Sequence, residues 1–166
     1  MKKIILSLAC VVATAVSAFA NEPATEAADV MRETPKYENV ADVLNVIVAQ
    51  HPGKVVFVDL WATWCGPCIN AMQTMKPLKE WMAEQGIVTI YVSAPNSDRA
   101  RWESMIGGIG GNHYWFNQEE WNAVREKYPF NGIPTYMIFD REGNHSFQQS
   151  GYPGNDKMQA EFEKLL

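Results

Sequence analysis

A nearly continuous run of β-branched and aromatic residues at Val55 to Trp61 constrains the fold of this 166-residue chain more than any other feature. Such a run indicates a central strand buried on both faces, because a strand with one solvated face alternates apolar with polar residues. Apolar residues at helical spacing follow between Ile69 and Met82 and predict a long helix that ends at Gln85-Gly86. Pro77 should kink this helix, since its ring collides with the carbonyl four residues earlier.

Strands and helices alternate along the rest of the chain. We expect helices at 40–48, 97–105, 118–128 and 155–166, strands at 87–92, 113–116, 135–140 and 145–150, a glycine-rich loop at 107–111 and a hairpin turn at 141–144. Alternation of this kind implies parallel strand pairs, and the final hairpin adds an antiparallel edge. The sequence therefore predicts an α/β fold, with a central mixed sheet that contains a parallel βαβ unit and helices on both faces.

The first 20 residues have the features of an export signal. Two lysines precede an apolar run from Ile4 to Val16, and Ala18-Phe19-Ala20 supplies the small-x-small pattern for cleavage before Asn21. The run is interrupted and shorter than the roughly 20 residues that a membrane span needs. A lipoprotein site at Cys10 would leave almost no apolar region before it. We therefore expect a signal peptide over residues 1–20 and a periplasmic or otherwise extracytoplasmic location.

The residues after the signal divide into two parts. Residues 21–38 are rich in Ala, Glu, Pro and Thr without a clear period, and we interpret them as a flexible leader that tethers the domain or packs loosely on it. Residues 39–166 form the expected domain. The chain as a whole is 47% hydrophobic and 20% charged, a balance that argues against disorder.

Loss of the signal changes the charge and the cysteine count. It leaves 14 − 2 = 12 basic and 19 acidic side chains, a net charge of −7. An acidic chain without a basic cluster argues against nucleic acid and anionic lipid as partners. The signal also contains Cys10, so Cys65 and Cys68 are the only cysteines expected in the mature chain. A spare thiol would be a liability in oxidising surroundings, and this count fits sulfur chemistry confined to one pair.

Two cysteines separated by two residues can hold half of a zinc site, attach haem, form an inert disulfide or cycle between dithiol and disulfide. A zinc site needs four ligands, and His51, His113 and His145 are far apart, so that we expect them on the surface or in loops. Haem attachment needs a histidine after the second cysteine, where Ile69 stands. An inert disulfide would close a small loop and add little stability. Redox cycling is the best interpretation, and we expect neither a metal nor another cofactor.

The position of the pair favours that chemistry. Free N–H groups and the helix dipole at the start of the helix stabilise a thiolate on Cys65, and only the thiolate attacks a disulfide. Cys68 lies one turn further on and is expected to be enclosed and protonated until it attacks the mixed disulfide. Pro67 costs no hydrogen bond in the first turn. Trp64 supplies an apolar shoulder that limits access of water.

Two segments resemble the two signatures of the thioredoxin family. The first is Val58-Asp59-Leu60-Trp61-Ala62-Thr63-Trp64-Cys65-Gly66-Pro67-Cys68, and the second is Asn131-Gly132-Ile133-Pro134-Thr135-Tyr136, whose proline is cis in that family. The resemblance covers about Val40 to Leu166 and implies the thioredoxin fold. The export signal and the long stretch between the strand at 87–92 and the proline turn are similar to the TlpA/ResA branch of exported thioredoxin-like thiol-disulfide oxidoreductases.

The resemblance implies a role for each matching residue. Cys65 would be the nucleophile and Cys68 the resolving thiol. Asp59 would be a buried carboxylate that moves a proton to or from Cys68, and a hydrogen-bonded carboxyl at the strand end is the alternative. Pro134 would face the dithiol from the opposite loop. The backbone of Ile133 would pair with an extended substrate segment, as in strand addition.

The expected function is reduction of disulfides in protein substrates by a monomeric exported protein that a membrane electron donor recharges. Gly66-Pro67 and Ile133 resemble the reducing thioredoxins. The branch suggests apocytochrome c as a substrate in cytochrome c maturation, and general disulfide repair fits equally well. A periplasmic disulfide oxidase or isomerase would use the same residues, with the net flow of electrons in the opposite direction. A non-catalytic binding module with a static disulfide is the third alternative.

Two features depart from the family pattern. Gln73 occupies the position, five residues after the second cysteine, where thioredoxins have a proline, and the only proline of the helix is Pro77. The kink is therefore expected about one turn later, with a changed surface near Cys65. The stretch from Ala94 to Gln118 matches no family pattern, and we expect its glycine-rich part to be a mobile loop.

Overall fold

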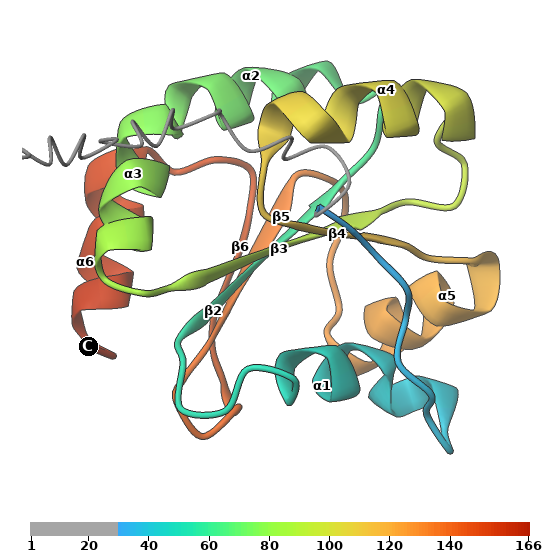
Figure 1. Cartoon of the computed structure of the whole chain (residues 1–166), viewed down its shortest axis with the longest axis horizontal. Coiled ribbons are helices and arrows are strands. Elements are labelled where there is room, and N and C mark those ends of the chain that lie inside the picture. The colour runs from blue at the N-terminus through green and yellow to red at the C-terminus, as the bar shows by residue number, and fades with distance from the viewer. Residues whose placement is uncertain (1–29) are drawn as a thin grey trace, which may run out of the picture.

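In the computed structural model, which describes residues 30–166, a six-stranded mixed sheet has the order β1-β4-β3-β2-β5-β6 (Figure 1). The strands are β1 Met31–Arg32, β2 Val56–Trp61, β3 Val88–Ser93, β4 Asn112–Trp115, β5 Thr135–Phe139 and β6 His145–Ser150. The β1–β4, β4–β3 and β3–β2 pairs are parallel, whereas β2–β5 and β5–β6 are antiparallel. The predicted fold class is confirmed, and the expected signal peptide at residues 1–20 lies outside the described residues.

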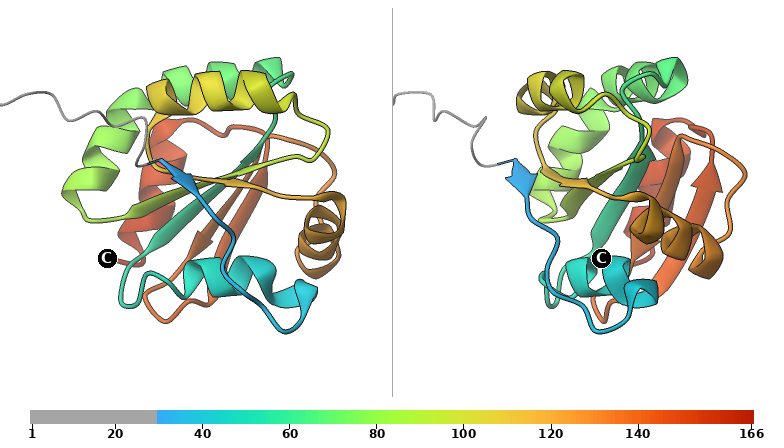
Figure 2. Two further views of the ribbon diagram at one scale, coloured as in Figure 1. Left: turned by 45° about the vertical axis from the view of Figure 1, so that its right-hand side comes forward. Right: turned by 90° about the vertical axis from the view of Figure 1, so that its right-hand side faces the viewer.

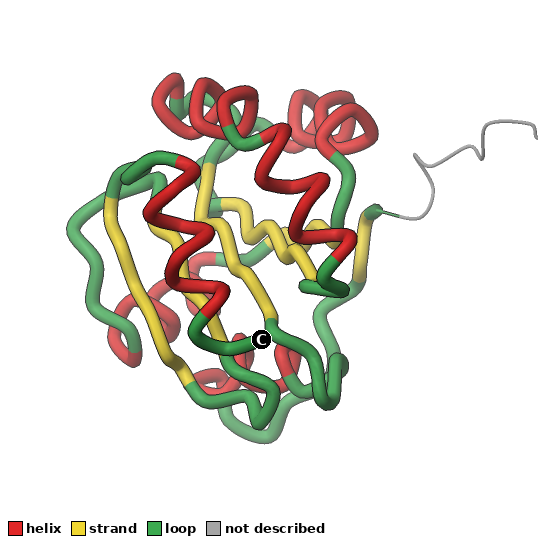
Figure 3. The backbone as a smooth tube through the Cα atoms, turned by 90° about the vertical axis from the view of Figure 1, so that its left-hand side faces the viewer, coloured by secondary structure: helices red, strands yellow, loops and turns green. Residues whose placement is uncertain are grey.

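Helices cover both faces of the sheet (Figures 1 and 2). They are the 3-10 helix η2 Val40–Asp42 and the α-helices α1 Val43–Val48, α2 Gly66–Thr74, α3 Lys76–Glu84, α4 Arg99–Ile109, α5 Gln118–Lys127 and α6 Asn155–Glu163. One face packs against α1 and α5, and the other against α2, α3, α4 and α6. Figure 3 shows the helix that leads to the C-terminus lying in front of the strands on this second face.

Strand β2 lies in the centre of the sheet, and all six of its residues are buried. Val58 and Leu60 pack in the core on the α1 and α5 side. Phe57 and Trp61 pack on the opposite side, with α3 and α6 and with the cysteine pair respectively. Because successive side chains of a strand point to opposite faces, Asp59 shares the face of Phe57 and Trp61. The sequence thus places one carboxyl on the face that packs against α2.

The long helix expected between Ile69 and Met82 is divided into α2 and α3 at Met75. Pro77 lies in the first turn of α3, where a missing N–H breaks no helical hydrogen bond. In a continuous helix its ring would collide with the carbonyl of Gln73. The kink expected at Pro77 therefore takes the form of a break two residues before the proline.

The loop in the glycine-rich segment is shorter than the predicted loop at 107–111. Gly107 and Gly108 belong to α4, which runs to Ile109, so the loop prediction is wrong for these residues. The buried side chains of Trp102 and Ile106 hold this helix against the core, and such packing outweighs the low helix propensity of glycine.

The turn after α4 depends on the glycine at position 111, which gives a testable prediction. Gly111 has φ +84°, and a Cβ there would lie 3.0 Å from Cε2 of Tyr91 and 3.2 Å from the carbonyl oxygen of Thr89. We expect Gly111→Ala to lower the free energy of unfolding by about 2–3 kcal/mol, measured by urea denaturation. Gly53→Ala is the matched control, because Gly53 has φ +73° but open space around the Cβ position. An equal loss in both variants would contradict the steric explanation.

The described part of the expected leader packs on the domain. Val30 is buried, and Met31 and Arg32 pair with β4. The Nε of Arg32 donates a hydrogen bond to Oδ1 of Asn112 (2.9 Å), and the hydroxyl of Tyr37 donates to Oε1 of Glu120 (3.2 Å). The sequence analysis did not predict the strand β1, because an edge strand of two residues leaves no periodic pattern in the sequence.

Candidate functional site

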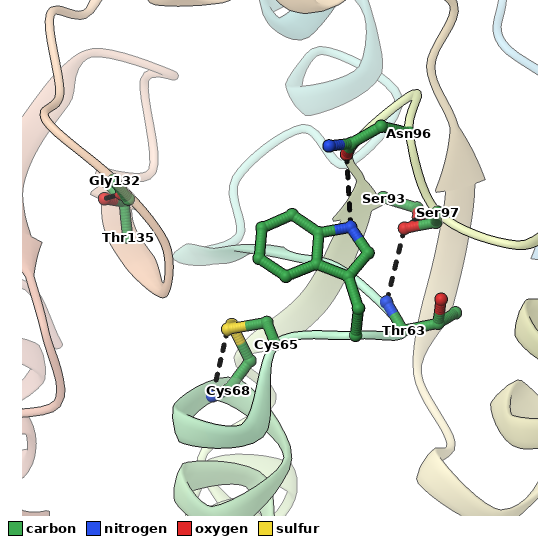
Figure 4. Close-up of a disulfide and its surroundings, with 9 residues drawn as sticks. Thr63, Cys65, Cys68, Ser93, Asn96, Ser97, Gly132 and Thr135 are labelled. Carbon is green, nitrogen blue, oxygen red and sulfur yellow. Dashed lines mark hydrogen bonds between the residues drawn. A yellow bond between two sulfur atoms is a disulfide. The ribbon is translucent and has the colours of Figure 1, made fainter.

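The two cysteines lie at the start of α2 and form a disulfide with a Cα–Cα distance of 5.3 Å (Figure 4). Cys65 is the N-cap residue and Cys68 lies in the first turn. The backbone N–H of Cys68 donates a hydrogen bond to Sγ of Cys65 (3.2 Å). Cys68 is fully buried and Cys65 is 3% exposed. In the first turn of a helix this N–H has no backbone acceptor, and its hydrogen bond to Sγ of Cys65 stabilises a thiolate there.

The loop before the cysteines is fixed to the loop after β3. The N–H of Thr63 donates to Oγ of Ser97 (3.2 Å), and the N–H of Asp98 donates to Oγ1 of Thr63 (3.2 Å). The indole Nε1 of Trp64 donates to Oδ1 of Asn96 (3.3 Å), and 55% of the surface of Trp64 is exposed. The indole therefore forms an oriented apolar surface beside the disulfide.

Gly66 and Pro67 form the exposed first turn of α2 between the two sulfurs. A Cβ at Gly66 would meet no atom within 4 Å, so packing does not require glycine at this position. Pro67 occupies a position where a helix needs no N–H donor. The dipeptide is thus exposed, whereas both cysteines beside it are buried.

The turn before β5 lies across from the disulfide (Figure 4). The Ile133–Pro134 peptide bond is cis, and Pro134 is buried. Oγ1 of Thr135 donates to the carbonyl of Gly132 (2.6 Å) and closes the turn. Ile133 packs against the apolar cluster that contains both cysteines. Within residues 30–166 no backbone hydrogen bond outside the regular elements involves Ile133, which leaves an edge for an extended segment.

Asp59 is fully buried on the face of β2 that packs against α2. Neither carboxyl oxygen has a hydrogen-bond partner among the described residues. Burial raises the pKa of Asp59 to about 8, and the positive charge of Lys79 opposes that rise. The carboxyl is therefore mostly protonated at neutral pH and titrates in the range where cysteine thiols do.

Two tyrosines flank Asp59 across the sheet, and sequence reasoning missed them. Tyr91 on β3 and Tyr136 on β5 are both in register with Asp59. Their hydroxyls are buried without a hydrogen-bond partner in the described chain, and burial raises the pKa of each, with the charge of Asp59 adding to the rise. Strand register becomes visible only in the folded sheet, which is why the pattern of single strands did not reveal this row.

Lys79 reaches this row of side chains from α3. Its Nζ lies 5.3 Å from the centroid of the Tyr91 ring and donates to the carbonyl of Ile109 (2.9 Å). Burial lowers the pKa of Lys79, whereas the charge of Asp59 acts in the opposite direction. The lysine is thus the cation whose charge favours ionisation of Asp59.

His113 is buried, so the expectation of a surface or loop position is wrong for this histidine. Its ring stacks on that of Tyr91, with centroids 4.5 Å apart and planes at 10°, and Nε2 lies 3.0 Å from the carbonyl oxygen of Gly110. Burial lowers the pKa of His113 to about 4, so the ring is neutral at physiological pH. Among residues 30–166, no three His, Cys, Asp or Glu side chains are grouped so as to hold a metal ion.

No helix within residues 30–166 has the length and apolar character that crossing a membrane requires. This finding concerns only the domain and the described part of the segment before it.

Comparison with known proteins places these features in a family. Residues 53–145 match the family model described as "Thioredoxin-like". The chain is 25% identical over 113 residues to the thiol-disulfide oxidoreductase ResA of Bacillus thuringiensis. This alignment covers 68% of the present chain and 64% of ResA. It is 27% identical over 113 residues to the thioredoxin of Alicyclobacillus acidocaldarius, covering 68% and 83%. The chain thus matches less than two thirds of the length of the ResA relative.

A solved structure supports the same relationship. The solution structure of a putative thiol-disulfide oxidoreductase from Bacteroides vulgatus superposes with a TM-score of 0.56 at 27% identity. The superposition covers 71% of this chain and 75% of the other.

Proposed function

Because the chain belongs to the thioredoxin-like family, we propose that it is an exported thiol-disulfide oxidoreductase that reduces disulfides in protein substrates. One observation carries this proposal: the Cys65–Cys68 disulfide lies at the start of α2, and the N–H of Cys68 donates a hydrogen bond to Sγ of Cys65. The exposed indole of Trp64 lies beside the pair, and Asp59 lies buried on the strand face that packs against α2.

The proposed reaction assigns different roles to the two sulfurs, because Cys65 caps α2 and Cys68 lies in its first turn. The Cys65 thiolate attacks one sulfur of the substrate disulfide, forms a mixed disulfide and releases the first substrate thiolate. Cys68 then loses its proton and attacks Sγ of Cys65. This step forms the Cys65–Cys68 disulfide and releases the second substrate thiolate. Two electrons pass to the substrate, and the protein is left oxidised.

Asp59 is the group proposed to take the proton of Cys68. It is the buried carboxyl on the face of β2 that packs against α2, and its pKa of about 8 lies near that of a thiol. A base with a matched pKa transfers a proton in either direction at little cost. Ile133 and Pro134 are proposed to hold the substrate, whose extended backbone would pair with the free edge at Ile133.

Each turnover oxidises the protein, so a reductant must restore the dithiol. The signal-like residues 1–20 support an extracytoplasmic site of action, and a membrane protein is then the proposed electron donor. Apocytochrome c in cytochrome c maturation, which the resemblance to the TlpA/ResA branch implies, is the proposed substrate. We further propose that residues 39–166 act as one monomeric domain, without a metal or another cofactor.

Insulin reduction tests the activity directly. The reduced wild-type protein should accelerate the dithiothreitol-dependent precipitation of insulin, because its dithiol reduces the interchain disulfides. A wild-type protein that fails to do so would favour a non-catalytic binding module with a static disulfide.

Trapping tests the class of substrate. Cys68→Ser removes the resolving thiol, so substrates should remain attached to Cys65 as mixed disulfides. We expect mass spectrometry of extracytoplasmic extracts to identify proteins with paired cysteines, among them apocytochromes. Recovery of cysteine proteins without disulfides would contradict the proposed reaction.

A further inference from the structure

A pocket of about 280 Å³ extends from Trp64, the residue before Cys65, to the turn at Ile133. The loop with Trp64, the loop with Asn96, the turn at Ile133 and the helix α5 form its walls. Two of its wall residues, Trp121 and Ile133, pack against the apolar cluster that contains Cys65 and Cys68. A segment of substrate that lies along Ile133 would therefore pass directly over this pocket, which we call the Arg125 pocket after the cation in its wall.

The aromatic walls are held in place in the free protein. The rings of Trp121 and Phe130 meet edge to face, with centroids 5.5 Å apart, and Asn96 orients the indole of Trp64. Helix α5 begins with a capping box, in which Asn117 and Glu120 each bond the backbone N–H of the other. A preformed cavity with aromatic walls favours a large apolar side chain, since little order is lost on binding.

Arg125 supplies the only cation among the residues that line this pocket. Its guanidinium carbon lies 5.8 Å from the centroid of the Phe130 ring, and the residue is exposed. Within residues 30–166 no carboxylate forms an ion pair with it, although the chain carries 19 acidic against 14 basic side chains. An unpaired guanidinium at the edge of an apolar pocket attracts a carboxylate and repels a cation.

We propose that the Arg125 pocket binds a substrate segment in which an aromatic side chain stands next to an acidic residue. This inference rests on the proposed function, since it assigns a sequence preference to the same dithiol. The aromatic ring enters the space between Trp64 and the contacting pair of Trp121 and Phe130, and the carboxylate pairs with Arg125 at the rim. The segment is extended because its backbone pairs with Ile133, and this places its disulfide near Cys65.

Single-turnover reduction of designed peptides tests the proposal. The substrates are peptide dimers joined by one disulfide, with Phe-Glu, Phe-Lys or Ala-Glu two residues from the cysteine on either side. We expect the reduced wild-type protein to reduce the Phe-Glu peptide about five-fold faster than the other two in one of the two placements, measured by stopped-flow fluorescence. Raising the salt concentration from 0.05 to 0.5 M should remove most of the difference between Glu and Lys.

Charge reversal at Arg125 separates local pairing from the overall charge of the protein. We expect Arg125→Glu to prefer the Phe-Lys peptide over the Phe-Glu peptide by about five-fold. Lys164→Glu is the matched control: it changes the net charge equally, but Lys164 is exposed at the end of α6, and its ion pair is with Glu161. If Arg125→Glu changes the reduction rates of both peptides by the same factor, the proposal is overturned. A reversal of the peptide preference in Lys164→Glu as well would also overturn it.

The outcomes distinguish this inference from the proposed function. Reduction of all peptides without preference would overturn the pocket assignment and leave the oxidoreductase intact. A wild-type protein that reduces none of them would contradict the oxidoreductase. The same peptides with serine in place of cysteine then test the pocket by calorimetry. Tighter binding of Phe-Glu than of Phe-Lys, reversed in Arg125→Glu, supports the inference, and equal affinities overturn it.

Discussion

The Cys65→Ser protein should show no insulin reduction above background, a loss of at least about 10³-fold relative to the wild type. Cys65 is the sulfur that caps α2 and accepts the N–H of Cys68, whereas the hydroxyl of serine neither ionises at neutral pH nor attacks a disulfide. The measurement is the initial rate of insulin precipitation, with circular dichroism to verify that the variant is folded.

The Cys68→Ser protein is the informative counterpart. It should react once with a peptide disulfide at nearly the wild-type rate and then stop, because the first step needs only Cys65. Substitution by serine is nearly isosteric, so the first turn of α2 should keep its geometry. A Cys65→Ser protein that still turns over insulin would show that the dithiol is not the reacting group.

The Asp59→Asn protein should lose the pH dependence that a buried carboxyl imposes on stability. The pKa of Asp59 is about 8 in the folded protein and near 4 in the unfolded chain, so between these values the folded state binds more protons. Stability of the wild type therefore falls as pH rises from about 4 to 8. The asparagine variant lacks this term and should exceed the wild type in stability by a few kcal/mol at pH 9, measured by urea denaturation at several pH values. Asp156→Asn, an exposed carboxyl on α6, should leave the slope unchanged.

Asp59→Asn should also slow the resolving step. Loss of a positioned base costs on the order of 10²-fold in rate, and the inflection near pH 8 in the pH–rate profile should disappear. The measurement is the decay of the mixed disulfide formed in single turnover. A stability slope and a decay rate identical to those of the wild type would mean that Asp59 neither titrates in this range nor moves the proton.

Much of the fold could be predicted from the sequence because its elements carry strong local signals. The buried run at β2 and the helical spacing after it fixed the position of the cysteines at a strand-to-helix junction. The match of two separate segments to the thioredoxin signatures then led to the prediction that Asp59 and the turn at Ile133-Pro134 belong to one site. These residues needed no knowledge of distant contacts.

The features that were missed depend on long-range packing. Tyr91 and Tyr136 reach Asp59 only through the register of β3 and β5 with β2. Gly107 is helical because the buried side chain of Trp102 packs α4 against the core. His113 is buried because β4 pairs with β3 in the sheet. Local propensity contains none of this information, since the same residues in a peptide would have no partners to pack against.

The Arg125 pocket illustrates the same limit at the site. Trp64 and Ile133 belong to recognised signatures, but Arg125 and Trp121 come from α5, in a part of the chain that the signatures do not cover. Their position in the wall of this pocket depends on the packing of α5 on η2 and α1. Specificity is therefore the part of the function that needs the structure most.

Equilibration with glutathione measures the central claim most directly. The fraction of protein with the Cys65–Cys68 disulfide is determined at a series of glutathione ratios, by alkylation and mass spectrometry. The account predicts a reversible two-electron transition near the potential of thioredoxin, about −270 mV, as expected for a reductase with Gly66-Pro67 between its sulfurs. A potential near the DsbA value of about −120 mV would assign the protein to the oxidases, and a disulfide that does not exchange with glutathione would contradict the redox cycle itself.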